Sequence, residues 1–144
     1  KDFKILNLGD KNDTSETQVR AGHDAYLKSF GCIHNRSISI DKVNNKIVGQ
    51  DKLIHKSVNS KIKYDIHFHL YPGLSVVQTI GGNTLLIQIN KNKALLFSTN
   101  EKNLKIEKSI FFGGQKVLDN YCIVISGIME NNEKVIDWEI IKKL

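Results

Sequence analysis

Apolar and polar residues alternate along most of this chain, and this two-residue period limits the folds open to it. The clearest case lies at 61–71, where one parity is polar and the other is apolar, namely Ile62, Tyr64, Ile66, Phe68 and Leu70. Such alternation is typical of a strand with one face in the core. No segment of useful length shows a convincing helical period. We therefore expect an all-β chain.

Turn residues divide this pattern into roughly ten short strands, the number expected of an antiparallel β-sandwich or an open barrel. Gly81-Gly82-Asn83 joins 74–80 to 84–89 as a hairpin, and Asp41 to Asn45 joins 37–40 to 46–53. The stretch 121–129 is apolar on both parities, which predicts a central strand. Further strands are expected at 3–8, 16–21, 104–112 and 136–140, with one helical turn at 24–30.

The length and charge of the chain fit one domain without an obvious polyanion partner. The 144 residues are enough to bury a core, so we expect a single β-sandwich domain from 1 to 144. Of the 21 basic residues only Arg20 and Arg36 are arginines, and the lysines are dispersed among acidic residues and asparagines. The net charge of +6 therefore favours a solvated surface over an acidic ligand. Among acidic ligands, an acidic polysaccharide fits these dispersed lysines at least as well as nucleic acid, and we expect no nucleic-acid partner.

Cysteine usage and the start of the chain leave the compartment open. Cys32 and Cys122 lie far apart in sequence and form no metal-ligand spacing, so we expect two buried thiols in preference to a disulfide. No apolar run approaches the ~20 residues of a membrane span. An export signal upstream of Lys1 would make the protein periplasmic or secreted, and without one it would be cytoplasmic.

Two histidines one residue apart, His67 and His69, point the same way on the predicted strand. Two ligands do not make a metal site, because zinc usually takes three or four from the protein. The cupin pattern of H-x-H followed by a glutamate fails, since residues 70–77 contain no carboxylate. A third ligand from a distant strand, such as His34 or His55, stays open. We nevertheless expect no metal and no cofactor, and we interpret the two histidines as part of the solvent-exposed face of a strand.

A second group gathers histidine, tyrosine and arginine between residues 22 and 36. His34 and Arg36 share parity with Ile38 and Ile40, which would point a charge toward the core and demand a carboxylate partner. The plainer interpretation is a structural ion pair with Asp24 or Asp51. The functional one is a groove that holds an acidic sugar. The candidate substrate-binding residues are His23, Tyr26, His34, Arg36 and His69.

A succession of short motifs gives the chain a family resemblance. Gly22-His23-Asp24-Ala25-Tyr26, Phe30-Gly31, His34-x-Arg36 and Gly49-x-Asp51 are followed by Phe68-His69-Leu70-Tyr71-Pro72, Glu107-x-Ser109, Gly113-Gly114 and Ile123-Val124-Ile125-Ser126-Gly127. In this order they resemble the C-terminal part of heparinase II/III-like proteins, over about residues 22–138. Two positions depart from the family pattern: His67 stands where arginine is frequent, and Tyr71 where a second histidine is frequent.

The resemblance implies a β-sandwich that packs on an upstream α/α-toroid in a polysaccharide lyase. Such enzymes cleave uronate-containing glycans by β-elimination, in which a base removes the C5 proton and an acid protonates the leaving oxygen. The family's catalytic asparagine and tyrosine belong to the toroid, and its H-x-H-A-D and H-N-T segments to the early sandwich. None of these is visible here, so we expect no catalytic residue on this chain. The alternative is a stand-alone carbohydrate-binding or interaction module.

Overall fold

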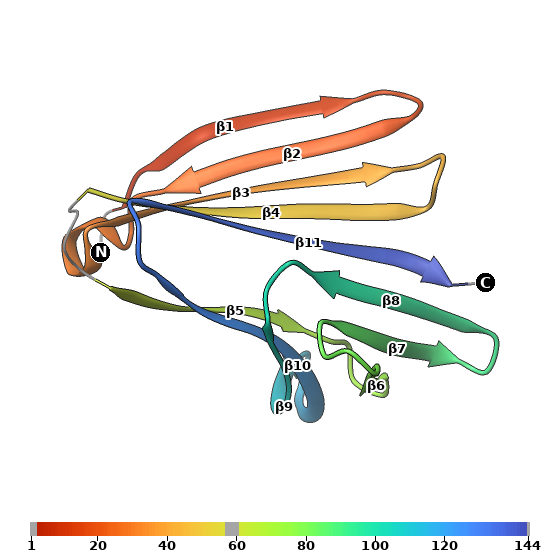
Figure 1. Cartoon of the computed structure of the whole chain (residues 1–144). Helices are drawn as coiled ribbons and strands as arrows, with labels where there is room; N and C mark the ends of the chain where they lie inside the picture. The colour runs from red at the N-terminus through yellow and green to blue at the C-terminus, as the bar shows by residue number, and fades with distance from the viewer. Residues whose placement is uncertain (1–2, 57–60, 144) are drawn as a thin grey trace. The chain divides into compact units, whose positions relative to one another are not determined.

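The computed structural model describes residues 3–56 and 61–143. Within these residues the chain forms eleven strands and one short helix, which confirms the all-β prediction (Figure 1). The elements are β1 (Ile5–Asn12), β2 (Glu16–His23), α1 (Leu27–Phe30), β3 (Cys32–Asp41), β4 (Lys46–His55), β5 (Ile62–His69), β6 (Ser75–Gln78), β7 (Thr84–Asn90), β8 (Lys93–Thr99), β9 (Asn103–Gly113), β10 (Lys116–Met129) and β11 (Glu133–Lys143).

The described strands form two sheets. Eight of them follow the order β1-β2-β3-β4-β11-β8-β7-β6, and β5-β10-β9 form the other sheet. The predicted hairpins β3–β4 and β6–β7 are confirmed, and β9 pairs with β10 across a turn at Gly113 and Gly114. Strand β8 was not predicted, because its apolar run, Ala94 to Phe97, has only four residues, too few to distinguish a buried strand from a helical segment. The predicted helical turn is shorter than expected and begins at Leu27.

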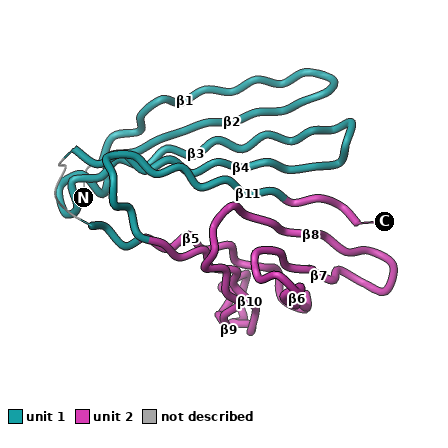
Figure 2. Tube along the Cα trace, in the orientation of Figure 1, with its two compact units in different colours: residues 1–63, 128–139 teal, residues 64–127, 140–144 magenta. Residues whose placement is uncertain are grey.

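Close contacts divide the chain into two compact units, each coloured separately in Figure 2. Unit 1 comprises Lys1–Lys63 and Ile128–Glu139, and unit 2 comprises Tyr64–Gly127 and Ile140–Leu144. The two cysteines fall in different units, and each is a buried free thiol, as the sequence predicted. No helix in the described part of the chain is long and apolar enough to cross a membrane.

Unit 1 is built on consecutive antiparallel pairs from β1 to β4. His23 on β2 lies opposite His34 on β3, and Arg36 on β3 lies opposite Asp51 on β4. Because residues opposite each other share a face, the pairing places these four side chains on the same side of the sheet. The apolar core on that side includes Leu53, Ile136 and Trp138. The sheet register thus builds the polar cluster directly against a hydrophobic core.

Unit 2 contains strands of both sheets, which face each other as in a β-sandwich. The ring of Phe68 on β5 meets that of Phe97 on β8 edge to face, with centroids 5.0 Å apart. Strand β10 is central in its sheet and buried on both parities over Cys122–Ile125, as predicted. His67 and His69 are exposed on the opposite face from Phe68, which confirms the prediction that this face of the strand contacts solvent. A fully buried phenylalanine or large aliphatic side chain stabilises the folded state by about 1.5–3 kcal/mol relative to the same side chain left in water.

Candidate functional site

Asp51 is the centre of the polar cluster in unit 1. Its side chain is fully buried, and its two oxygens accept four hydrogen bonds. Arg36 donates from Nε to Oδ1 at 2.7 Å and from Nη2 to Oδ2 at 3.2 Å. The indole Nε1 of Trp138 donates to Oδ2 at 2.9 Å, and Nε2 of His34 lies 2.6 Å from Oδ1. Asp51 is therefore the carboxylate partner that the position of Arg36 demands.

The electrostatics of Asp51 follow from these contacts. Burial by itself would raise the pKa of this carboxyl, but the hydrogen bonds from His34, Arg36 and Trp138 together hold the pKa below its ordinary value. The group is therefore a permanent anion at neutral pH. The Asp51 carboxylate binds the guanidinium of Arg36 and the imidazole of His34 on the face of the sheet that packs on the core.

His23 and His34 form a short relay that ends on Asp51. The backbone N–H of Ala25 donates to Nδ1 of His23 at 3.3 Å, so Nε2 of His23 must carry the ring proton. That nitrogen lies 3.2 Å from Nδ1 of His34, which accepts, and Nε2 of His34 then donates to Asp51. The network therefore assigns the same neutral tautomer to both rings. Burial, with a smaller effect of His34, lowers the pKa of His23, while Asp24 opposes the shift.

Tyr26 completes the cluster at its exposed side. Tyr26 is the N-cap residue of α1, and its ring packs edge to face against that of His23 with centroids 5.1 Å apart. Gly31 ends this helix with φ of 64°, a conformation that suits glycine, and donates its N–H to the Leu27 carbonyl. The short helix therefore holds Tyr26 against the relay.

The structure brings together four of the five predicted binding residues: His23, Tyr26, His34 and Arg36. His69 belongs to unit 2, where it is exposed and its Nδ1 lies 3.4 Å from the Ser109 hydroxyl. Of the two carboxylates offered as partners for Arg36, Asp51 takes the role. Asp24 instead accepts the backbone N–H of Lys4 at 2.6 Å.

Trp138 is the member of this cluster that the sequence did not reveal. A signal was present in Gly49, which shares a strand face with Asp51. A Cβ at Gly49 would lie 2.0 Å from the indole ring, so only glycine lets the ring lie against the strand. Glycine inside a strand often marks such a close approach, but the identity of the approaching group depends on a residue 89 positions away.

The cluster combines a buried carboxylate with a guanidinium, two imidazoles and an indole N–H. The side chain of Arg36 is 36% exposed and that of His34 is 20% exposed. Each side chain therefore bonds to the buried carboxylate of Asp51 and still has part of its surface in contact with solvent. The other face of the same strands lines a cavity of about 290 Å³, with Arg20, Asn35, Ser37, Gln50 and Lys52 among its walls. Both faces of β3 and β4 therefore carry polar side chains.

A family model described as heparinase II/III-like, C-terminal, matches residues 4–139. The chain belongs to this heparinase II/III-like C-terminal family. Its cluster, carried by His23, His34, Arg36 and Asp51, lies within the matched region. A sequence search of curated proteins gives no match.

Solved structures share the fold of this heparinase II/III-like domain. A heparan sulfate lyase, HepC from Pedobacter heparinus, has a TM-score of 0.80 at 12% identity, over 96% of this chain and 22% of the lyase. The heparinase III BT4657 gene product has a TM-score of 0.73 at 11% identity, over 98% of this chain and 21% of that protein. The chain therefore spans about a fifth of the length of these proteins.

Proposed function

We propose that this chain is the C-terminal domain of a polysaccharide lyase that cleaves uronate-containing glycans by β-elimination, and that it supports the cleft without catalysing the reaction. The observation that carries this proposal is the family match over residues 4–139. The names of the similar structures, a heparan sulfate lyase and a heparinase III, supply the substrate class. Because the match runs through both units, we also propose that they belong to one domain.

The partner of this domain would be an upstream α/α-toroid that carries the catalytic residues. The contribution of the domain would be the exposed edges of its cluster: Arg36 offers charge for a carboxylate, and Tyr26 and His34 offer ring edges for a sugar. Asp51 would hold Arg36 and His34 in place through the bonds described above. In this role a lost contact weakens substrate binding more than it slows the chemical step.

Tyr26→Ala in the full-length protein tests this role. The Tyr26 residue is 47% exposed, so its removal leaves the core intact. We expect KM for an acidic glycan to rise by about 3–10-fold with kcat changed little, because the lost contact would be made equally in the ground state and the transition state. Tyr71→Ala is the matched control, since Tyr71 is 70% exposed and outside the cluster. Equal kinetics for Tyr26→Ala and the unmodified protein would count against a substrate contact at the cluster.

The cavity on the other face of the strands supports a second candidate, a carbohydrate-binding module that works without a lyase. Arg20 and Lys52 would there hold an acidic sugar beside the amides of Asn35 and Gln50. This candidate predicts that the isolated chain binds an acidic oligosaccharide without cleaving it, and that Arg20→Ala weakens this binding. The lyase proposal requires neither result.

A further inference from the structure

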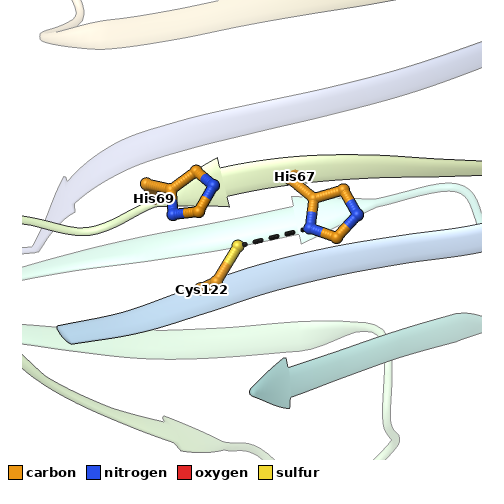
Figure 3. Close-up of side chains that lie close together, drawn as sticks. All are labelled: His67, His69 and Cys122. Atoms are coloured by element: carbon orange, nitrogen blue, oxygen red, sulfur yellow. Dashed lines mark hydrogen bonds between the residues drawn. The ribbon is translucent and has the colours of Figure 1, made fainter. Parts of the chain in front are cut away.

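Three metal-ligand side chains meet on one face of the three-stranded sheet in unit 2, where the two histidines are exposed and the cysteine is buried. His67 and His69 extend from β5, and Cys122 extends from the neighbouring strand β10 (Figure 3). One donor atom from each of the three lies within 4.8 Å of the other two. The sequence offered the two histidines without a third ligand, and the structure supplies it in Cys122 rather than in His34 or His55.

The spacing of the donors suits a small thiophilic cation. In a tetrahedral zinc site with Zn–N near 2.0 Å and Zn–S near 2.3 Å, neighbouring nitrogen and sulfur ligand atoms are about 3.3–3.5 Å apart. Sγ of Cys122 and Nδ1 of His67 already lie 3.6 Å apart. His69 would need to move its ring on the order of 1 Å, which an exposed side chain does by a small rotation.

We propose that His67, His69 and Cys122 form a zinc-binding site, with the fourth coordination position open to water. Zinc binds both cysteine thiolate and histidine nitrogen, and sites with three protein ligands keep a fourth position for water. The site would link β5 to β10 through side chains, in addition to the backbone pairing of the two strands. This proposal is independent of the lyase proposal, because it uses none of the residues of the cluster in unit 1.

Neighbouring polar groups on the same face fit a cation. Glu107 on β9 is the direct cross-strand partner of Cys122, so its carboxylate faces the same side and adds negative charge. The Ser109 hydroxyl, 3.4 Å from Nδ1 of His69, is the type of outer contact that fixes the ring of a ligating histidine. A site with two neutral imidazoles, one thiolate and a nearby carboxylate therefore favours a divalent ion.

Metal binding must displace the thiol proton of Cys122. Zinc binds cysteine as the thiolate, not as the thiol. On binding, the zinc–sulfur bond forms, the S–H bond breaks and the proton passes to solvent.

Titration of the full-length protein with Co²⁺, a spectroscopic substitute for Zn²⁺, tests the site. We expect saturable binding with a thiolate-to-cobalt charge-transfer band that grows in proportion to occupancy, and displacement of the band by Zn²⁺. His67→Ala should weaken Co²⁺ binding by at least about tenfold, because it removes one of three ligands. This histidine is exposed, so the variant retains the fold.

Two cysteine variants separate this site from any other metal bound by the full-length protein. Cys122→Ala should abolish the charge-transfer band, whereas Cys32→Ala, the matched removal of the other buried thiol, should leave it unchanged. Far-ultraviolet circular dichroism confirms that each variant is folded. The proposal is overturned by the absence of a thiolate band in the unmodified protein, or by a band that persists in Cys122→Ala or in His67→Ala at the original affinity.

Discussion

Asp51 carries its charge at a position from which solvent is excluded, and its four hydrogen bonds are what make that position tolerable. A buried anion with cationic and neutral donors is stable only as a set, since removing one member leaves the others unsatisfied. Its lowered pKa means that its stabilising contribution is complete above the ordinary carboxyl pKa near 4 and is lost as pH falls through the folded value. Asp51 thus explains why Arg36 and His34 can both point toward the core.

Asp51→Asn should reduce the free energy of unfolding by about 3–5 kcal/mol, because Arg36 would keep its charge beside a neutral amide. Urea denaturation followed by tryptophan fluorescence measures the loss. Asp10→Asn is the control, since Asp10 is exposed on β1 and its change should stay within about 0.5 kcal/mol. A loss no larger than that of Asp10→Asn would show that the cluster does not stabilise the fold.

His23 gives the cluster a pH dependence of its own. Its pKa is lowered from 6.5 in the folded state, so the unfolded chain binds the proton more readily. The free energy of unfolding should therefore fall as pH drops below about 6.5, whereas above it the contribution is fully present. In His23→Gln this part of the fall should disappear, as measured by urea midpoints between about pH 5 and pH 7.5. An identical pH dependence in the two proteins would contradict the neutral relay.

The packing of β4 against β11 depends on a glycine. At Gly49 a methyl group would overlap the Trp138 ring, whose indole also donates to Asp51. The two strands are far apart in sequence, so their side chains must be matched through the fold. The Trp138 ring occupies the space that a side chain at Gly49 would need.

Gly49→Ala should lower the free energy of unfolding by about 1–3 kcal/mol or more, because the ring must shift and weaken its bond to Asp51. Gly9→Ala provides a matched strand glycine, where the added methyl group meets the flexible side chain of Arg20 at 2.7 Å. Thermal unfolding of both variants measures the difference. Equal melting temperatures would mean that the Trp138 contact is not tightly packed.

Local patterns predicted the strands that alternate and the turns that contain glycine, and thus most of the elements. The same parity argument placed Arg36 toward the core and offered Asp51 as its partner, because β3 and β4 form a hairpin of fixed register. Strand β8 was not predicted because its apolar run of four residues is too short to distinguish a strand from a helical segment. Trp138 and Cys122 were not predicted as members of their clusters. Their partners are set by pairing between strands that are far apart in sequence, which a local pattern does not encode.

Taken as a whole, the chain corresponds to about a fifth of the proteins whose structures it resembles. Its family membership is shown by the match over residues 4–139, and its fold agrees. The lyase activity is a proposal about the larger protein to which such a domain would belong. On this proposal the toroid supplies the reaction and the sandwich supplies contacts and support.

The most direct test of this division is the rise in ultraviolet absorbance that accompanies the formation of unsaturated uronates. The full-length protein and the 144-residue chain would each be mixed with heparan sulfate and other uronate-containing glycans. We predict a steady rise in absorbance with the full-length protein on at least one glycan, and no rise with the chain alone. A rise with the isolated chain, or none with the full-length protein on any of these glycans, would contradict the account.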